Sequence, residues 1–215
     1  MVKTKEISQV KLEVLNSLTH GIGIILGVIF LLMLLLPSIR QGNVSKIVAF
    51  SIYGGCFILL FFSSTLYHSL SLTKAKSILR VLDHSSIYLF IAGSYMPIIL
   101  LVLKGKFKIA ALVIISALAI SGVVYKILSY GKYDKYKRFS TLLYILMGWL
   151  ALFLIRPIIK EVSIYFFLII LLGGIIYSGG TYFYKQNKRY SHVIWHLFVL
   201  AAAVTQFLAI YFFIL

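Results

Sequence analysis

Three histidines in two separate parts of the sequence have the spacing of a metal site. His192 and His196 are four residues apart, which places both side chains on one face of a helix. His68 lies in another apolar segment, one helical turn after Ser64. Three neutral imidazoles supply three nitrogen ligands and leave the fourth position of a tetrahedral ion open for water, as in catalytic zinc sites. The sequence therefore predicts a zinc site formed by His68, His192 and His196.

Asp83 is the acid that we expect beside this site. The chain has only five acidic residues, of which Glu6, Asp134 and Glu161 are expected in solvated segments. An acid at an apolar span needs a reason, because a central Asp costs about 2.5 to 3.5 kcal/mol on insertion scales. We expect Asp83 to be either a direct ligand or, as we favour, an outer acceptor that holds the water and acts as general base.

Ser64 is the second catalytic candidate, since its hydroxyl could bond the water, the carboxylate or a substrate carbonyl. Asn16 and His20 could join the same polar cavity, or they could cap and anchor the first apolar segment. His84 points about 100° away from Asp83 on a helix, so we expect it to be an outer or interfacial residue. Glu13, just before the first span, receives no role.

Membrane helices must position these residues. The chain is 61% hydrophobic and 12% charged, with a mean hydropathy of +1.02, which excludes a soluble domain of 215 residues. Each crossing needs about 20 apolar residues. We predict an all-α membrane protein, a seven-transmembrane-helix bundle forming one domain over residues 1–215, with a short segment 1–15 before the first span. The expected spans are 16–36, 46–67, 81–103, 109–128, 139–155, 163–184 and 192–215.

The positive charge predicts orientation and partners. The net charge of +16 comes from Lys and Arg blocks between the apolar runs, which favours contact with anionic lipid headgroups and not with nucleic acid. Alternate gaps hold 14 and 7 of these cations. Because cytoplasmic loops are enriched in Lys and Arg, we predict a cytoplasmic N-terminus and an outside C-terminus. The candidate site then lies near the cytoplasmic face.

Small residues at helical spacing are expected to let neighbouring helices approach closely, as at Gly23 and Gly27 and at Gly174 and Ser178. No Gly-rich loop follows a strand pattern, so a nucleotide cofactor is not expected.

The chain resembles the hemolysin III proteins, the bacterial branch of the progestin and adipoQ receptor superfamily, from Glu13 to the last span. The motifs that carry the resemblance are Glu13-x-x-Asn16-x-x-Thr19-His20-Gly21, Ser64-x-x-x-His68, Asp83-His84-Ser85-Ser86-Ile87-Tyr88 continuing to Ala92-Gly93-Ser94-Tyr95-Met96-Pro97, and His192-x-x-x-His196.

The resemblance implies a seven-helix protein of the plasma membrane with its N-terminus inside and zinc near the cytoplasmic face. It implies that zinc is held at the positions of His68, His192 and His196, with those of Asp83 and Ser64 beside a bound water. The superfamily is also similar to alkaline ceramidases, which hydrolyse a lipid amide. Met96, where relatives often have Thr, is a minor departure.

The expected function is therefore zinc-dependent hydrolysis of a lipid amide or ester, with an acyl chain entering laterally between helices. Fold and family do not fix chemistry. Two alternatives stay open: a membrane-state sensor or receptor-like protein with structural zinc, and a pore-forming hemolysin. The pore has the least support, because few polar residues lie along the spans. The sequence indicates neither the substrate nor the oligomeric state.

Overall fold

The computed structural model describes residues 2–186 and 188–215, and it describes the side chains of these except residues 2–8, 133 and 134. The side chains of Glu6 and Asp134 therefore lie outside the described set. The described residues form helices and no strand. In chain order the helices are α1 (Val2–Arg40), α2 (Val44–Ser69), α3 (Lys76–Leu101), α4 (Gly105–Leu128), α5 (Tyr133–Trp149), η1 (Leu150–Leu154), α6 (Ile155–Glu161), α7 (Ile164–Lys185) and α8 (Ser191–Phe213).

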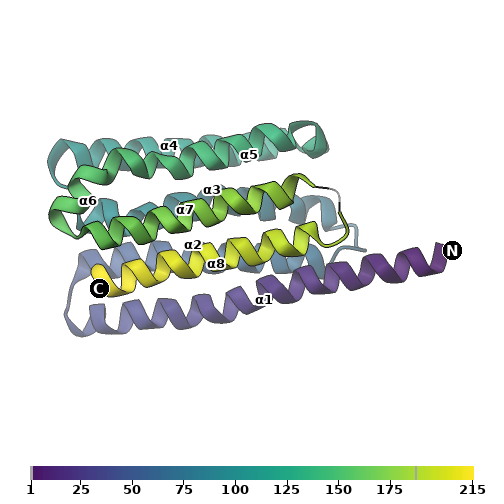
Figure 1. Cartoon of the computed structure of the whole chain (residues 1–215), viewed down its shortest axis with the longest axis horizontal. Helices are drawn as coiled ribbons and strands as arrows, with labels where there is room; N and C mark the ends of the chain where they lie inside the picture. Colours follow the sequence, from purple (N-terminus) through teal and green to yellow (C-terminus); the bar gives the residue numbers. More distant parts are fainter. Residues whose placement is uncertain (1, 187) are drawn as a thin grey trace.

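Among the residues that the structure describes, seven spans are long and apolar enough to cross a membrane, which confirms the predicted seven-helix bundle. The fifth span is composite, because α5, η1 and α6 follow one another over residues 135–161. The two termini lie at opposite ends of the bundle, as an odd number of crossings requires (Figure 1). Which end faces the cytoplasm stays a prediction from the Lys and Arg count.

One of the cations in that count is buried inside the bundle. Lys126 lies in the last turn of α4, is 2% exposed, and donates from Nζ to Ser140 Oγ on α5 at 2.7 Å. Without it the two sides hold thirteen and seven cations, and the predicted orientation is unchanged.

The first helix begins well before the predicted span. Residues 2–20 contain neither Gly nor Pro and are rich in Lys, Leu, Glu and Val, so nothing in them ends a helix. Figure 1 shows the N-terminal end of α1 extending beyond the other helices. Glu13, Asn16 and His20 therefore lie inside α1. The alternative that Asn16 and His20 cap this helix is wrong.

The fifth span is interrupted at a proline. Pro157 has no backbone N–H, and it is accommodated in the first turn of α6, where the helix needs no such donor. The 3₁₀ turn η1 separates this start from α5. The Tyr95 hydroxyl donates to the carbonyl oxygens of Met147 and Gly148 at 3.0 and 2.8 Å. The end of α5 is thereby attached to α3.

The helices form a closed arrangement around an interior space. α3 packs against α2, α4 and α5, α7 packs against α5 and α8, and α1 closes the ring by contacting α2 and α8. In Figure 1, α5, α7 and α8 stand in front of α4, α3 and α2. Aromatic side chains fill the contact between α2 and α3, with Phe57 and Phe90 edge to face at 5.5 Å. This core holds α2 and α3 in a fixed register.

The expected role of small residues holds for one pair of positions and not for the other. A Cβ at Gly23 would lie 2.3 Å from the Phe61 ring, and one at Gly27 would lie 2.8 Å from Phe57. These glycines therefore permit α1 to approach α2. A Cβ at Gly174 meets nothing within 4 Å, so Gly174 does not mediate close packing.

Replacing Gly23 by Leu should destabilise the bundle, because Phe61 is fully buried and has no room to move. Overpacking of this kind costs about 1 to 3 kcal/mol. The matched control is Gly21→Leu in the same helix, where a Cβ meets nothing within 4 Å and the gain in helix propensity is equal. The thermal midpoint in detergent should fall for Gly23→Leu alone, and equal midpoints would contradict this packing.

Candidate metal centre

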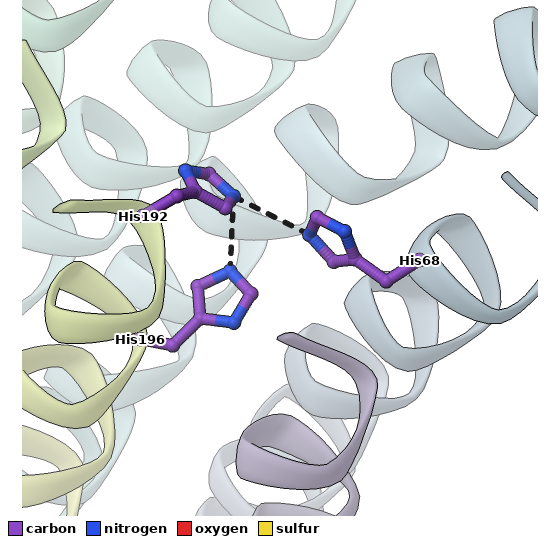
Figure 2. A group of neighbouring side chains, drawn as sticks. All are labelled: His68, His192 and His196. Atoms are coloured by element: carbon purple, nitrogen blue, oxygen red, sulfur yellow. Dashed lines mark hydrogen bonds between the residues drawn. The ribbon is translucent and has the colours of Figure 1, made fainter. Parts of the chain in front are cut away.

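The three predicted histidines meet in space. His68 ends α2, and His192 and His196 lie one turn apart at the start of α8. Nε2 of His192 lies 3.3 Å from Nε2 of His68 and 3.1 Å from Nε2 of His196 (Figure 2). One nitrogen from each ring lies within 4.8 Å of the others. We call His68, His192 and His196 the histidine triad.

The other ring nitrogens of two triad members have their own acceptors. Nδ1 of His68 lies 2.6 Å from the Glu13 carboxylate. Nδ1 of His196 lies 3.1 Å from the carbonyl oxygen of Asn16 and 3.2 Å from Thr19 Oγ1. A carbonyl and a carboxylate only accept, so both Nδ1 atoms carry the proton. In neutral rings the Nε2 atoms of His68 and His196 are then lone-pair donors.

The positions of these protons determine whether a metal ion fits between the three rings. The lone pairs of His68 and His196 both face Nε2 of His192, which carries at most one proton. A cation between the three nitrogens removes the repulsion and satisfies all three. Ligands bound tetrahedrally at about 2.0 to 2.1 Å lie about 3.3 Å apart. Two of the three separations, 3.1 and 3.3 Å, agree with this, and all three nitrogens lie within 4.8 Å of one another, so the triad could hold a metal ion.

Asp83 and Ser64 lie beside the triad without belonging to it. Ser64 is buried in α2, and its hydroxyl donates to the Asp83 carboxylate, which is also close enough to His68 to interact electrostatically. Asp83 is not among the described side chains whose donor atoms group with the three rings. Of the two roles expected for Asp83, the geometry favours the outer one.

His20 and Asn16 join the polar cavity. The His20 ring stacks on His196 with centroids 3.7 Å apart and meets Phe61 edge on at 5.0 Å. Both nitrogens of His20 are buried and have no hydrogen-bond partner among the described residues. Stacking against His20 and the hydrogen bond to the Asn16 carbonyl together fix the plane of the His196 ring.

Glu13 is the site residue that sequence reasoning missed. Its carboxylate bonds Nδ1 of His68 and also contacts Nζ of Lys76 at 3.3 Å. Metal-binding histidines commonly donate their second N–H to a carboxylate, which fixes the ring and raises its basicity. The helical spacing of Glu13, Asn16 and His20 was the available signal, because residues three and seven apart share a face. Because Glu13 is expected before the first span, the sequence alone does not predict this shared face.

His84 lies outside the triad, as expected. Its Nδ1 donates to the backbone carbonyl of Arg80 at 2.8 Å, and its Nε2 lies 3.5 Å from the Tyr184 hydroxyl. The backbone carbonyl oxygen of His84 accepts a hydrogen bond from the Tyr144 hydroxyl at 2.9 Å. These contacts hold the start of α3 against α5 and α7.

A cavity of about 930 Å³ opens beside the triad. Around the histidines its wall is polar and includes Glu13, Ser64 and Asp83. Towards the other end of the bundle the wall becomes mainly apolar. The buried apolar side chains along it include Phe90, Ile98, Phe167, Val199 and Ile210. The site can therefore place a polar group at the histidines and a hydrocarbon chain in the membrane interior.

Comparison with known proteins finds relatives along nearly the whole chain. The profile of a protein family described as haemolysin-III related matches residues 8–207. The chain is 41% identical over 207 residues to Hemolysin-3 of Bacillus cereus, covering 96% of this chain and 93% of the relative. It is 41% identical over 208 residues to the Hemolysin-3 homolog of Bacillus subtilis (strain 168), covering 95% of each. It is 30% identical over 210 residues to the human monocyte to macrophage differentiation factor, covering 91% of this chain and 82% of the relative.

Substitution of a triad histidine should remove bound metal. We expect His68→Ala to reduce the content from about one ion per chain to near zero, since a tetrahedral site with three protein ligands loses one of them. His84→Ala is the matched control, because the His84 side chain is also largely enclosed, at 12% exposed, and lies outside the triad. Elemental analysis of both purified variants checks this. Equal metal content in the two would assign the metal elsewhere.

Glu13→Gln should weaken metal binding and leave the triad in place. The amide cannot match the charge-assisted bond to His68, and loss of such an outer contact typically lowers metal affinity about 10- to 100-fold. Glu161→Gln is the control, because Glu161 pairs with Lys104 at the opposite end of the bundle. Competition with a chelator of known affinity measures the effect, and identical affinities for the two variants would remove Glu13 from the site.

Proposed function

The chain belongs to the haemolysin-III related family, and from that premise we propose that it is a zinc-dependent hydrolase of a lipid amide or ester. It is a multi-pass membrane protein, and for a bacterial member of the family the membrane is the cell membrane. The observation that carries the proposal is the convergence of three Nε2 atoms beside an acid at the head of an apolar cavity.

Zinc is proposed as the ion because three imidazole nitrogens with an open fourth position form a typical catalytic zinc donor set. His68, His192 and His196 would hold it, and Glu13 and the Asn16 carbonyl would keep the rings in the required tautomer. When bound, zinc would polarise a substrate carbonyl and acidify a water molecule.

Asp83 and Ser64 supply the proton chemistry in this proposal. The Asp83 carboxylate takes the proton of the attacking water and returns it to the leaving group. The hydroxyl of Ser64 donates to the same carboxylate and so holds it in one rotamer. Because both side chains are largely enclosed, few solvent molecules compete for these bonds.

A lipid substrate is proposed because exposed residues of the fifth span line the cavity. Gly148 and Leu152 line it, and both are exposed, Leu152 to 44%. Ile170 and Gly174 of α7 line the facing wall. An acyl chain can therefore pass from the bilayer between the fifth span and α7 into the apolar part of the cavity.

One observation favours the sensor or receptor-like alternative with a structural metal. The triad joins α2 to α8, and its outer contacts reach α1, so an ion would bind three helices together. If the metal has only this structural role, its loss lowers the thermal stability of the protein and leaves the lipid composition of the membrane unchanged. The pore-forming alternative receives less support, because the deep wall of the cavity is mainly apolar and a water-filled path needs polar lining.

The Asp83→Ala variant distinguishes the proposed hydrolase from the alternative in which the metal is only structural. As a general base outside the triad, Asp83 should be dispensable for metal binding and its loss should slow hydrolysis on the order of 10² to 10⁴-fold. The measurement is lipid profiling of membranes from cells expressing wild type or Asp83→Ala, together with elemental analysis of both proteins. Glu161→Ala, an acid at the far end of the bundle, is the control.

The expected result is equal metal content and an acyl lipid that accumulates only with Asp83→Ala. If both proteins hold metal and the lipid pools are indistinguishable, hydrolysis is contradicted. A large fall in the thermal midpoint of metal-free protein would then support the structural role.

A further inference from the structure

Beyond the histidine triad, several polar side chains on the cavity wall are already hydrogen-bonded within the protein. Ser94 and Thr181 each donate to a backbone carbonyl oxygen of their own helix at 2.7 Å. The Tyr95 hydroxyl donates to the end of α5, and the Ser178 hydroxyl oxygen accepts from the Trp149 ring at 3.1 Å. These side chains therefore meet the usual requirement that a buried polar group has a partner.

Two polar groups on the same wall differ from these. The hydroxyl of Tyr177 on α7 and the side-chain oxygen Oε1 of Gln206 on α8 are buried and have no hydrogen-bond partner among the described residues. A buried polar atom without a partner is unfavourable, and folded proteins retain few of them. Two such atoms on one cavity wall therefore indicate a place for a polar group that comes from outside the chain.

The packing of α7 on α8 brings these two groups together. A Cβ at Gly173 would lie 3.2 Å from Cγ of Gln206, so the Gln206 side chain lies against the buried Gly173. Tyr177 is one helical turn after Gly173 on the same face of α7. Because helical side chains lean towards the N-terminus of their helix, the Tyr177 ring leans towards the turn that Gln206 contacts. We call Tyr177 and Gln206 the deep polar pair.

The deep polar pair is far from the triad. Gln206 comes ten residues after His196 on α8, which is about 15 Å along the helix axis. An extended chain advances about 1.2 Å per bond, since the three backbone bonds of one residue span at most about 3.3 to 3.6 Å. A group at the deep polar pair is therefore about 12 bonds from a group held at the triad.

The chemistry of the pair restricts which group it can bind. An amide oxygen only accepts, whereas a phenol hydroxyl both donates and accepts. An alcohol can donate to Gln206 and accept from Tyr177 at the same time. A ketone or ether oxygen would leave the Gln206 oxygen without a donor. A carboxylate or phosphate would face the lone pairs of that oxygen and would bring a charge into the membrane interior, which is costly.

We propose that the cavity selects an acyl chain with a hydroxyl group about 12 bonds from its acyl linkage, and that Tyr177 and Gln206 bind this hydroxyl. The apolar side chains between the triad and the pair match the intervening hydrocarbon. The inference rests on the proposed function, because that function places the acyl linkage at the triad. Its test measures binding alone.

The probes are octadecanoic acid and its 6-hydroxy and 12-hydroxy derivatives, which have no linkage to hydrolyse. The two hydroxy acids have the same polar groups and partition similarly into a neutral detergent, so a difference between them reports the position of the hydroxyl. The two tryptophans of the chain, Trp149 and Trp195, both line the cavity, so their fluorescence reports binding. The thermal midpoint is the second readout.

We expect wild-type protein to bind the 12-hydroxy acid about five- to tenfold more tightly than the 6-hydroxy acid, since each buried hydrogen bond contributes modestly. Tyr177→Phe and Gln206→Leu should each reduce this preference severalfold and keep the affinity for octadecanoic acid. The double variant should have no preference. Tyr88→Phe is the matched control, because it removes another buried hydroxyl without a described partner, and Tyr88 does not line the cavity. It should keep the preference.

A structural role of these residues is distinguished by stability. Because the Tyr177 hydroxyl bonds no described residue, Tyr177→Phe should not lower the thermal midpoint of the ligand-free protein. A fall in that midpoint with an equal loss of affinity for all three acids would overturn the proposal. If the double variant does not fold, the two single variants decide the result.

Equal affinity of wild-type protein for the two hydroxy acids would also overturn the proposal, since the deep polar pair would then bind water only. Failure of the proposed function is separate. If no lipid is hydrolysed but the preference depends on Tyr177 and Gln206, the hydroxyl site stands without hydrolysis. If a lipid is hydrolysed and the two hydroxy acids bind equally, hydrolysis stands without the hydroxyl site.

Discussion

The candidate metal site depends on ring nitrogens of the histidine triad whose lone pairs point toward one another at the start of α8. Three Nε2 atoms face one another, and for at least two of them the proton is held on the other side of the ring by Glu13 or by the Asn16 carbonyl. Such an arrangement is unfavourable in a protein interior unless a cation lies between the rings. Because the partners of these nitrogens lie on α1, α2 and α8, the three helices must keep fixed positions relative to one another at this end of the bundle.

The same constraint explains the division of the interior into two chemical regions. Ionisable groups are costly inside a bundle that faces lipid, and the described ones that line the cavity are gathered at one end, where they hydrogen-bond and pair with one another. The rest of the cavity is mainly apolar, and its walls are supported by the aromatic contacts of α2 and α3. An amphiphile fits such a cavity better than either a polar solute or a hydrocarbon, because each part of it meets a matching wall.

Much of the fold and the centre of the site followed from the sequence. Apolar runs of membrane length fixed the number of spans, and the four-residue spacing of His192 and His196 placed both on one face. The role of Glu13 did not follow, since its partner His68 is 55 residues away and the start of α1 was expected too late. The burial of Lys126 was missed because a cation at the end of an apolar run is normally solvated, and only the packing of α4 on α5 encloses it. Long-range contacts of this kind have no local pattern.

The distribution of the triad along the chain has a consequence for biosynthesis. One ligand is on the second span and two are on the last, with the outer contacts on the first. Membrane proteins are made from the N-terminus, so a nascent chain that ends before α8 carries a single triad nitrogen and cannot retain an ion. An ion held by the triad would therefore be acquired only after the last span is in place, and a chain released early would reach quality control without it.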